Sequence, residues 1–243
     1  MNQPVKPYNT SKSKKEEVAQ MFNNISSKYD FLNHVFSFGI DKRWRKKVIK
    51  ALKHEKPQLI LDIATGTGDF AIAALKLNPK KVIGIDISTG MLEVGKQKTR
   101  IHEKRDYIEL QEGDGENIQF PDNYFDAITV GFGVRNFENL EKGLGEMLRV
   151  LKPNGVAMIL EFSKPKNFPT KQIFGFYSKR IMPFFGRKIS KDERAYAYLP
   201  ESVQAFPEGE EMKKILLSVG FKLVEIRPLS GGIATIYAAR KTK

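Results

Sequence analysis

The chain has 243 residues, 41% of them hydrophobic, which suffices for one α/β domain with a lid or for two small domains. It contains no cysteine, and this excludes disulfides, thiolate metal sites and cysteine nucleophiles. No apolar run reaches the roughly 18–20 residues of a membrane-spanning helix, and the N-terminal residues are polar and rich in lysine, so we expect a cytoplasmic protein without a secretory signal.

The charge balance leaves two interpretations open. The chain has 41 Lys and Arg against 28 Asp and Glu, a formal net charge of +13. A basic surface of this kind binds nucleic acid or the anionic face of a membrane, whereas a solvated lysine coat binds neither.

The chain begins with a polar segment, 1–17, that we expect to be flexible. Residues 18–56 follow as two N-terminal helices: apolar residues recur at helical spacing after residue 18, and "DKRWRKKVIKAL" over 41–52 is a basic helix with Asp41 as its expected N-cap. We expect residues 18–243 to form a single domain.

From residue 59, short apolar runs alternate with amphipathic stretches. The runs are "LILDIA", "VIGIDI", "YIELQE", "FDAITVGF" and "VAMILEF", with helical patterns at about 68–77, 88–103 and 138–150. Fully apolar strands that alternate with helices predict an α/β fold, a mostly parallel sheet with helices on both faces.

The last part of the chain departs from this alternation. Residues 163–207 are rich in aromatic, proline and basic residues, and a stretch of this length between core elements predicts an ordered helical lid insertion. A helix ended by Gly220 and two strands joined at 230–232 follow, so the C-terminal strand is expected to be antiparallel.

A ligand site is predicted where the first two strands end. The strand at 59–63 runs into a loop with Gly66 and Gly68, which let the backbone turn sharply and let a ligand approach closely. Asp86 closes the second strand, where a carboxylate accepts hydrogen bonds from ribose hydroxyls. Asp114 and Gly115 follow the third strand and are placed to hold an adenine edge.

The loop favours S-adenosyl-L-methionine over a dinucleotide. The dinucleotide fingerprint G-x-G-x-x-G is not matched, because Ile72 stands where its late small residue belongs. Asp62 lies inside the first strand, a position better suited to a nearby cation than to a diphosphate. S-adenosyl-L-methionine carries a ribose, an adenine and a sulfonium but no phosphate.

Several longer motifs carry a resemblance to a known family. They are "KYDFLN", "SFGIDKRWRK", "GTGD", "FPDNYFD", "GFGVRNF", "RVLKPNG", "LEFSKP", "FYSKRIMPFFG" and "YAYLPES". With these the chain resembles the class I S-adenosylmethionine-dependent methyltransferases and, more narrowly, the UbiE/MenG family of C-methyltransferases of menaquinone and ubiquinone biosynthesis. "IMPFFG" is more similar to the menaquinone-type members.

The resemblance implies a Rossmann-like, seven-stranded sheet with the C-terminal hairpin at one edge. It implies donor contacts from Thr67, Asp86 and the pair Asp114-Gly115, and to these we add Asp62, Gly66, Gly68 and Tyr29 as cofactor-binding candidates. Many members have serine where this chain has Gly131, and histidine where it has Asp41 and Tyr237.

The implied reaction is C-methylation of a prenylated naphthoquinol, demethylmenaquinol to menaquinol, with the ubiquinone step as the alternative. A phenolate makes the ring carbon nucleophilic, and phenol pKa values lie near 10, so donors and positive charge at the hydroxyl assist. We therefore expect Arg135, Asn136 and Tyr177 as catalytic residues. The alternative for Arg135 is an ion pair with an acidic residue of a neighbouring loop.

The insertion offers further aromatic candidates. Tyr196 and Tyr198 face either the quinone or the core of the lid. Its phenylalanines together with Lys179 and Arg180 suit contact with an anionic membrane surface, or else form a lid core with solvated cations. No pair of histidines has metal-ligand spacing, so no metal is expected, and the oligomeric state stays open.

Three rival functions remain. An RNA methyltransferase is suggested by the charge, but the fourth strand ends in "GFGVRN" rather than in the Asn/Asp-Pro-Pro-aromatic tetrapeptide of many amino-methylating enzymes, and no RNA-binding module is visible, so we expect no nucleic-acid partner. The absence of cysteine excludes the pyrimidine mechanism that uses a cysteine nucleophile. A small-molecule N- or O-methyltransferase and a non-catalytic donor-binding protein are the other two.

Overall fold

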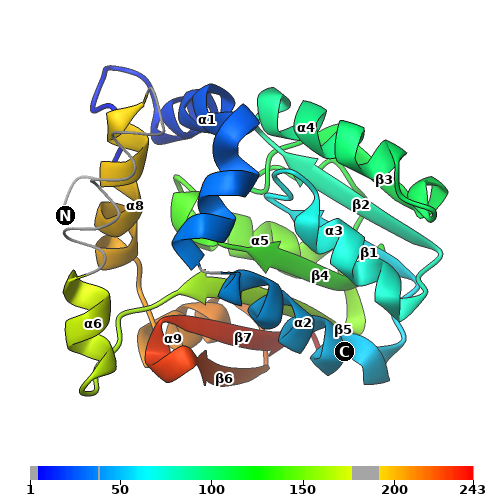
Figure 1. Cartoon of the computed structure of the whole chain (residues 1–243). Coiled ribbons are helices and arrows are strands. Elements are labelled where there is room, and N and C mark those ends of the chain that lie inside the picture. Colours follow the sequence, from blue (N-terminus) through cyan, green and yellow to red (C-terminus); the bar gives the residue numbers. More distant parts are fainter. Residues whose placement is uncertain (1–4, 38, 177–191, 243) are drawn as a thin grey trace.

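The computed structural model describes residues 5–37, 39–176 and 192–242, which fold around one seven-stranded sheet (Figure 1). The strand order is β3-β2-β1-β4-β5-β7-β6. The strands are β1 (Leu59–Ile63), β2 (Lys81–Asp86), β3 (Ile108–Glu112), β4 (Phe125–Gly131), β5 (Leu151–Phe162), β6 (Leu223–Leu229) and β7 (Ala234–Arg240). Strands β1 to β5 pair in parallel, and β7 pairs antiparallel with both β5 and β6, as the sequence predicted.

Helices cover both faces of the sheet. They are α1 (Lys14–Ser37), α2 (Ile40–Leu52), α3 (Asp69–Ala74), α4 (Thr89–Arg100), α5 (Leu140–Val150), α6 (Thr170–Phe176), α8 (Glu193–Ala205) and α9 (Glu210–Val219). In Figure 1, α2 and α3 lie in front of the sheet and α5 and α9 behind it. Each face of the sheet packs against its helices in an apolar core, and successive residues of β1 point into opposite cores. Ile60 packs with α2 and α3, whereas Leu61 packs with α5 and α9.

Side-chain caps and glycines set the helix ends. Ser88 and Asn139 accept hydrogen bonds from the first turns of α4 and α5, and Gly220 ends α9 at φ 123°. The expectation that Asp41 caps α2 is wrong: Gly39 takes that position at φ 69°. Asp41 lies within the first turn instead, where it is 1% exposed and pairs with Arg45 at 2.7 Å.

The N-terminal segment is in contact with the domain from residue 5. Helix α1 begins at Lys14, before the expected boundary at residue 18. The carboxylate of Glu17 accepts hydrogen bonds from the backbone N–H groups of Tyr8 at 2.7 Å and Thr10 at 2.6 Å. These hydrogen bonds hold the segment before α1 against the domain, because the fully buried carboxylate of Glu17 needs partners and finds them in the preceding backbone.

The predicted insertion over 163–207 contains α6 and α8. Residues 177–191 lie outside the described part of the chain. Helix α8 packs on α1 in a small apolar core that includes Val18, Met21 and Tyr198. The insertion is thereby joined to the N-terminal helix rather than to the sheet alone.

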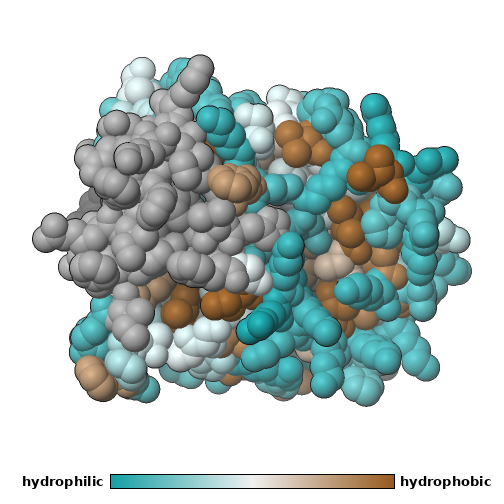
Figure 2. Space-filling view, in the orientation of Figure 1, coloured by the Kyte–Doolittle hydropathy of each residue, from teal (hydrophilic) through white to brown (hydrophobic). Residues whose placement is uncertain are grey.

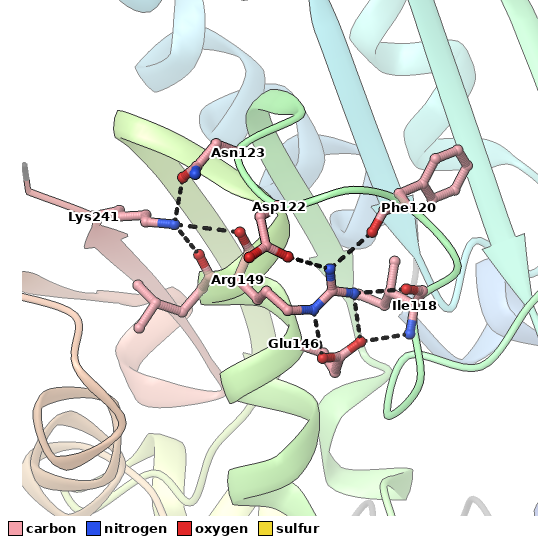
Figure 3. Close-up of polar contacts among 8 residues, drawn as sticks. Ile118, Phe120, Asp122, Asn123, Glu146, Arg149 and Lys241 are labelled. Carbon is pink, nitrogen blue, oxygen red and sulfur yellow. Dashed lines mark hydrogen bonds and ion pairs between the residues drawn. The ribbon is translucent and has the colours of Figure 1, made fainter.

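Arg149, at the end of α5, fixes the loop that leads from β3 to β4 (Figure 3). Its guanidinium donates to the carbonyl oxygens of Ile118 at 2.7 Å and Phe120 at 2.8 Å, and to the carboxylates of Asp122 and Glu146 at 2.8 Å. The planar guanidinium thus donates to two carbonyl and two carboxylate groups at once.

Replacing Arg149 by lysine is expected to destabilise the fold. An ammonium keeps the charge but cannot reach both carbonyls and both carboxylates, and each acceptor left without a donor costs about 1–3 kcal/mol. For a domain of this size, the melting temperature should fall by roughly 3–8 °C. Thermal unfolding followed by circular dichroism measures this, with Arg100→Lys, an exposed position on α4, as the control. Equal melting temperatures for the two variants would contradict the assignment.

Candidate active site

A cavity opens at the carboxyl ends of β1, β2 and β4, beneath α1. Its walls come from α1, from the glycine loop after β1, from the ends of β2 and β3 and from the segment after β4. They include Lys15, Tyr29, Gly66, Asp86, Met91, Asp114, Gly115, Glu116, Gly131, Gly133 and Asn136. Ligands bind at this edge of open parallel sheets because the loops after the strands meet there.

Glycines make part of this wall possible. Gly66 has φ 57°, a backbone conformation that L side chains rarely adopt. A Cβ at Gly133 would lie 2.5 Å from the Cβ of Ala64, and one at Gly115 would lie 2.8 Å from Ile63. The backbone therefore lies close to its neighbours and to the cavity. At Gly131, for which the family resemblance implied serine in many members, a Cβ would lie 2.7 Å from the ring of Phe70.

The segment after β4 turns sharply at Phe132. This residue has φ 58°, an outlier for a bulky side chain, and its ring stacks on Phe162 with centroids 4.4 Å apart. The short 3-10 helix Val134–Asn136 follows. The turn directs Gly133 and Asn136 into the cavity wall.

Asp86 lies at the cavity with its carboxylate already engaged. Its two oxygens accept hydrogen bonds at 2.8 Å, one from the backbone N–H of Gly66 and one from that of Ser88. Burial raises the pKa of Asp86 to about 6, and these hydrogen bonds oppose the rise. Asp86 thus holds the glycine loop against β2.

Three predicted donor residues do not line the cavity. Asp62 is fully buried behind the loop, where it accepts hydrogen bonds from Thr65 at 2.6 Å and Thr129 at 2.7 Å. Thr67 is 2% exposed and donates to Asp30 at 2.5 Å. Gly68, at φ 78°, is the N-cap of α3. Their observed contacts shape the loop.

Asp114 lies at the cavity together with Gly115, and its carboxylate meets α1. The ammonium of Lys15 lies 2.6 Å from Asp114 and 3.7 Å from Glu116. A ligand that bonds to the Asp114 carboxylate therefore shares it with Lys15. Reasoning from motifs missed Lys15, because nothing in the N-terminal sequence indicates which acidic loop α1 reaches.

Arg135 is buried in an ion pair. Its guanidinium lies 2.9 Å from the carboxylate of Glu161 near the end of β5, and the two side chains are 6% and 0% exposed. It also donates to the carbonyl oxygen of Phe132 and lies 5.5 Å from the ring of Phe162. The ion pair anticipated as the alternative is thus present, with a strand residue as the partner instead of a loop residue. Burial raises the pKa of Glu161, and Arg135 opposes that shift.

One donor of Arg135 is left over. Its Nε is buried and has no hydrogen-bond partner within the described part of the chain. Arg135 is not among the residues that line the cavity, but buried donors are nearly always satisfied, so an orphaned one beside the cavity wall calls for an explanation. Its sequence neighbours Val134 and Asn136 are buried too, and Asn136 is in the cavity wall.

Asn136 joins the cavity to the insertion. Its side-chain oxygen accepts a hydrogen bond from the hydroxyl of Tyr198 in α8 at 3.2 Å. Tyr29 lines the cavity from α1. Burial raises the pKa values of both tyrosines to about 12. Tyr177 lies outside the described residues, as does the side chain of Tyr196.

Neither Asp41 nor Tyr237, for which the family resemblance implied histidine in many members, lines the cavity. Tyr237 is 1% exposed, and its hydroxyl accepts a hydrogen bond from Gly209 at 2.7 Å. Asp41 is held by Arg45 in α2. Within residues 5–37, 39–176 and 192–242, no group of three His, Asp or Glu side chains is arranged to hold a metal ion.

Comparisons with known proteins show what the chain is similar to. A model of the ubiE/COQ5 methyltransferase family matches residues 10–241. A demethylmenaquinone methyltransferase of Bacteroides fragilis is 51% identical, with 99% of this chain and 100% of the relative covered. A ubiquinone/menaquinone biosynthesis C-methyltransferase UbiE of Geobacter sulfurreducens is 43% identical over 94% of this chain and 90% of its own.

The fold has solved counterparts as well. The crystal structure of a methyltransferase from Methanococcus maripaludis, described as S-adenosyl-L-methionine-dependent, superposes with a TM-score of 0.60 at 21% identity, with 97% of each chain covered. At this identity the likeness concerns the fold alone.

Proposed function

Because the chain belongs to the ubiE/COQ5 methyltransferase family and is thereby an S-adenosyl-L-methionine-dependent methyltransferase, we propose that it methylates a ring carbon of a prenylated hydroquinone, converting demethylmenaquinol to menaquinol. The observation that carries the proposal is the buried Nε of Arg135, a donor without a partner in the described part of the chain. A hydroxyl oxygen of the quinol is the acceptor that would satisfy it.

The cavity fits the donor. Among the described residues, its walls hold the carboxylates of Asp86, Asp114 and Glu116 and the ammonium of Lys15. Carboxylates accept hydrogen bonds from ribose hydroxyls and from an amino group, and they favour a nearby sulfonium, whereas they would repel a diphosphate. Asp86 would hold the ribose, and Asp114 with Gly115 would hold the adenine.

When bound, S-adenosyl-L-methionine would supply the methyl group to the ring carbon and leave as S-adenosylhomocysteine, and the proton displaced from that carbon would pass to water. The chain's own contribution is to position and polarise the acceptor. Arg135 donates to the developing phenolate, and Asn136, held by Tyr198, offers its amide at the cavity wall. Tyr29 and Phe22 of α1 cover the site and keep water from it.

The test is incubation with labelled donor and two reduced acceptors, a demethylmenaquinol and a precursor of ubiquinol, with the products read by mass. Methylation of the demethylmenaquinol is expected. Methylation of the ubiquinol precursor alone would replace this proposal by the ubiquinone step, and methylation of neither would overturn both. Transfer to RNA or to a small amine or hydroxyl compound would favour the rival methyltransferases.

We also propose that the protein contacts an anionic membrane surface, where a prenylated quinol resides. No helix in the described part of the chain is long and apolar enough to cross a membrane. Helix α2 instead presents exposed cations along one face, Lys42, Arg43, Lys46, Lys47 and Lys50. Figure 2 shows this hydrophilic band over α2, with an apolar strip between it and α6. The segment first expected to make this contact, around Lys179 and Arg180, lies outside the described residues.

Replacing Lys42, Lys46 and Lys50 together by glutamate should strongly weaken binding to vesicles that contain phosphatidylserine. Each basic residue near such a surface contributes about 1 kcal/mol, so loss and reversal of three charges lowers binding by roughly 100-fold or more. Co-sedimentation measures this, with Lys76, Lys213 and Lys214 replaced in the control variant. Vesicle binding that is unchanged by the α2 substitutions and by added salt would rule out the proposed membrane contact.

A further inference from the structure

The buried side chain of Lys14 has no part in the site described so far, yet it touches the segment that carries Arg135. Its ammonium donates to the carbonyl oxygens of Arg135 at 3.0 Å and of Phe137 at 2.8 Å. Its backbone N–H donates to the carboxylate of Glu138 at 3.1 Å. Lys14 is only 8% exposed, which is rare for lysine and indicates a committed contact.

The two carbonyls lie at the end of a short 3-10 helix. Residues 134–136 form this helix, and its last carbonyls have no partner within it. Other contacts hold the opposite edge of the same segment, since Glu161 accepts from the N–H of Arg135 at 3.3 Å and Glu116 accepts from that of Glu138 at 2.8 Å. Lys14 supplies the missing donors and so completes the frame around Arg135.

Helix α1 links this frame to the donor side of the cavity. Lys15, the next residue, pairs with Asp114, and Tyr29 of the same helix lines the cavity. The segment before α1 reaches α8, where the side chain of Arg194 donates to the carbonyl oxygen of Pro7 at 2.9 Å. One helix thus contacts the donor site, the Arg135 segment and the insertion.

We propose that Lys14 is a positioning residue for methyl transfer, holding the backbone of residues 135–137 so that Arg135 and Asn136 face the acceptor. The inference rests on the proposed function, because the acceptor it positions is the hydroquinone. It assigns no contact with substrate to Lys14 itself. Its effect is on the geometry of the segment and therefore on turnover more than on donor affinity.

The contact is sensitive to pH. Burial and the neighbouring charge of Arg135 lower the pKa of Lys14 to about 8, while Glu116 and Glu138 oppose the shift. The ammonium is fully present below that pKa and is lost as the pH rises through it. A neutral amine is the weaker donor to the two carbonyls, so the positioning effect declines between about pH 7 and pH 9.

The experiment compares Lys14→Gln with Lys12→Gln, which removes the same charge from an exposed neighbour whose ammonium contacts Gln20. For Lys14→Gln we expect kcat to fall about 10- to 100-fold with donor affinity changed less than threefold, and for Lys12→Gln no change. The ratio of wild-type to Lys14→Gln kcat should shrink from pH 7 to pH 9. Lys14→Arg, which keeps its charge throughout, should restore part of the activity and remove this pH dependence of the ratio.

Hydrogen exchange measures the effect of Lys14 on this segment independently of catalytic turnover. Amides of residues 134–138 should exchange faster in Lys14→Gln than in Lys12→Gln, while those of β4 should not. Equal exchange, or a kcat ratio that does not change with pH, would overturn the inference. If the wild type fails to methylate demethylmenaquinol, the proposed function falls, and the exchange experiment still decides whether Lys14 holds the segment.

Discussion

Replacing Arg135 by glutamine is expected to lower kcat for demethylmenaquinol by roughly 100- to 1,000-fold, the usual effect of removing one preorganised donor to developing negative charge. Donor affinity should stay within about threefold, because Asp86 and Asp114, the residues proposed to hold the donor, line the cavity, whereas Arg135 is not among its lining residues. Stopped assays with labelled donor give kcat, and calorimetric titration gives donor affinity.

The single substitution alone does not separate catalysis from folding. It leaves the carboxylate of Glu161 buried without its cation, and breaking one partner of a buried pair costs about 3–5 kcal/mol. The double variant Arg135→Gln/Glu161→Gln removes both charges and should recover most of the lost stability. We expect it to stay inactive. A stable double variant with near-normal turnover would reduce Arg135 to the structural ion pair of the alternative interpretation.

Replacing Asp86 by alanine is expected to weaken donor binding by roughly 100-fold or more, since two hydrogen bonds to a charged group are worth about 3 kcal/mol or more together. Part of the loss arises because Asp86 also holds the backbone of Gly66 and Ser88. Asp86→Asn, which keeps one acceptor oxygen, should lose less donor affinity than Asp86→Ala. Asp106→Ala, at a carboxylate that is 90% exposed, is the control.

The affinity of wild type for the donor should also depend on pH. Burial raises the pKa of Asp86 to about 6, so below that pH the carboxyl is mostly protonated and must lose its proton before it accepts two hydroxyls. Affinity should therefore be constant above about pH 7 and fall by up to about tenfold per pH unit below pH 6. In the empty protein the same raised pKa means that ionisation opposes folding as the pH rises from about 4 to 6. Affinity that is unchanged down to pH 5 would contradict the role of Asp86.

The order of the elements followed from the sequence because its cause is local. Apolar runs such as Leu59–Ile63 must be buried on both faces, and Gly220 and the turn at 230–232 mark where a helix and a strand end. The position of Asp86 followed in the same way, since the end of a parallel strand places its side chain at the ligand edge. The family resemblance then indicated the reaction, which neither composition nor spacing contains.

Partners that are distant in sequence needed the tertiary structure. The sequence placed Arg135 and Asn136 at the cavity edge, but whether a buried guanidinium meets Glu161 depends on how β4 pairs with β5. Lys14 and Lys15 look like members of a solvated lysine run, and only the docking of α1 shows that one reaches Phe137 and the other Asp114. Charge and periodicity are read along the chain, whereas a hydrogen bond forms between groups that packing brings together across it.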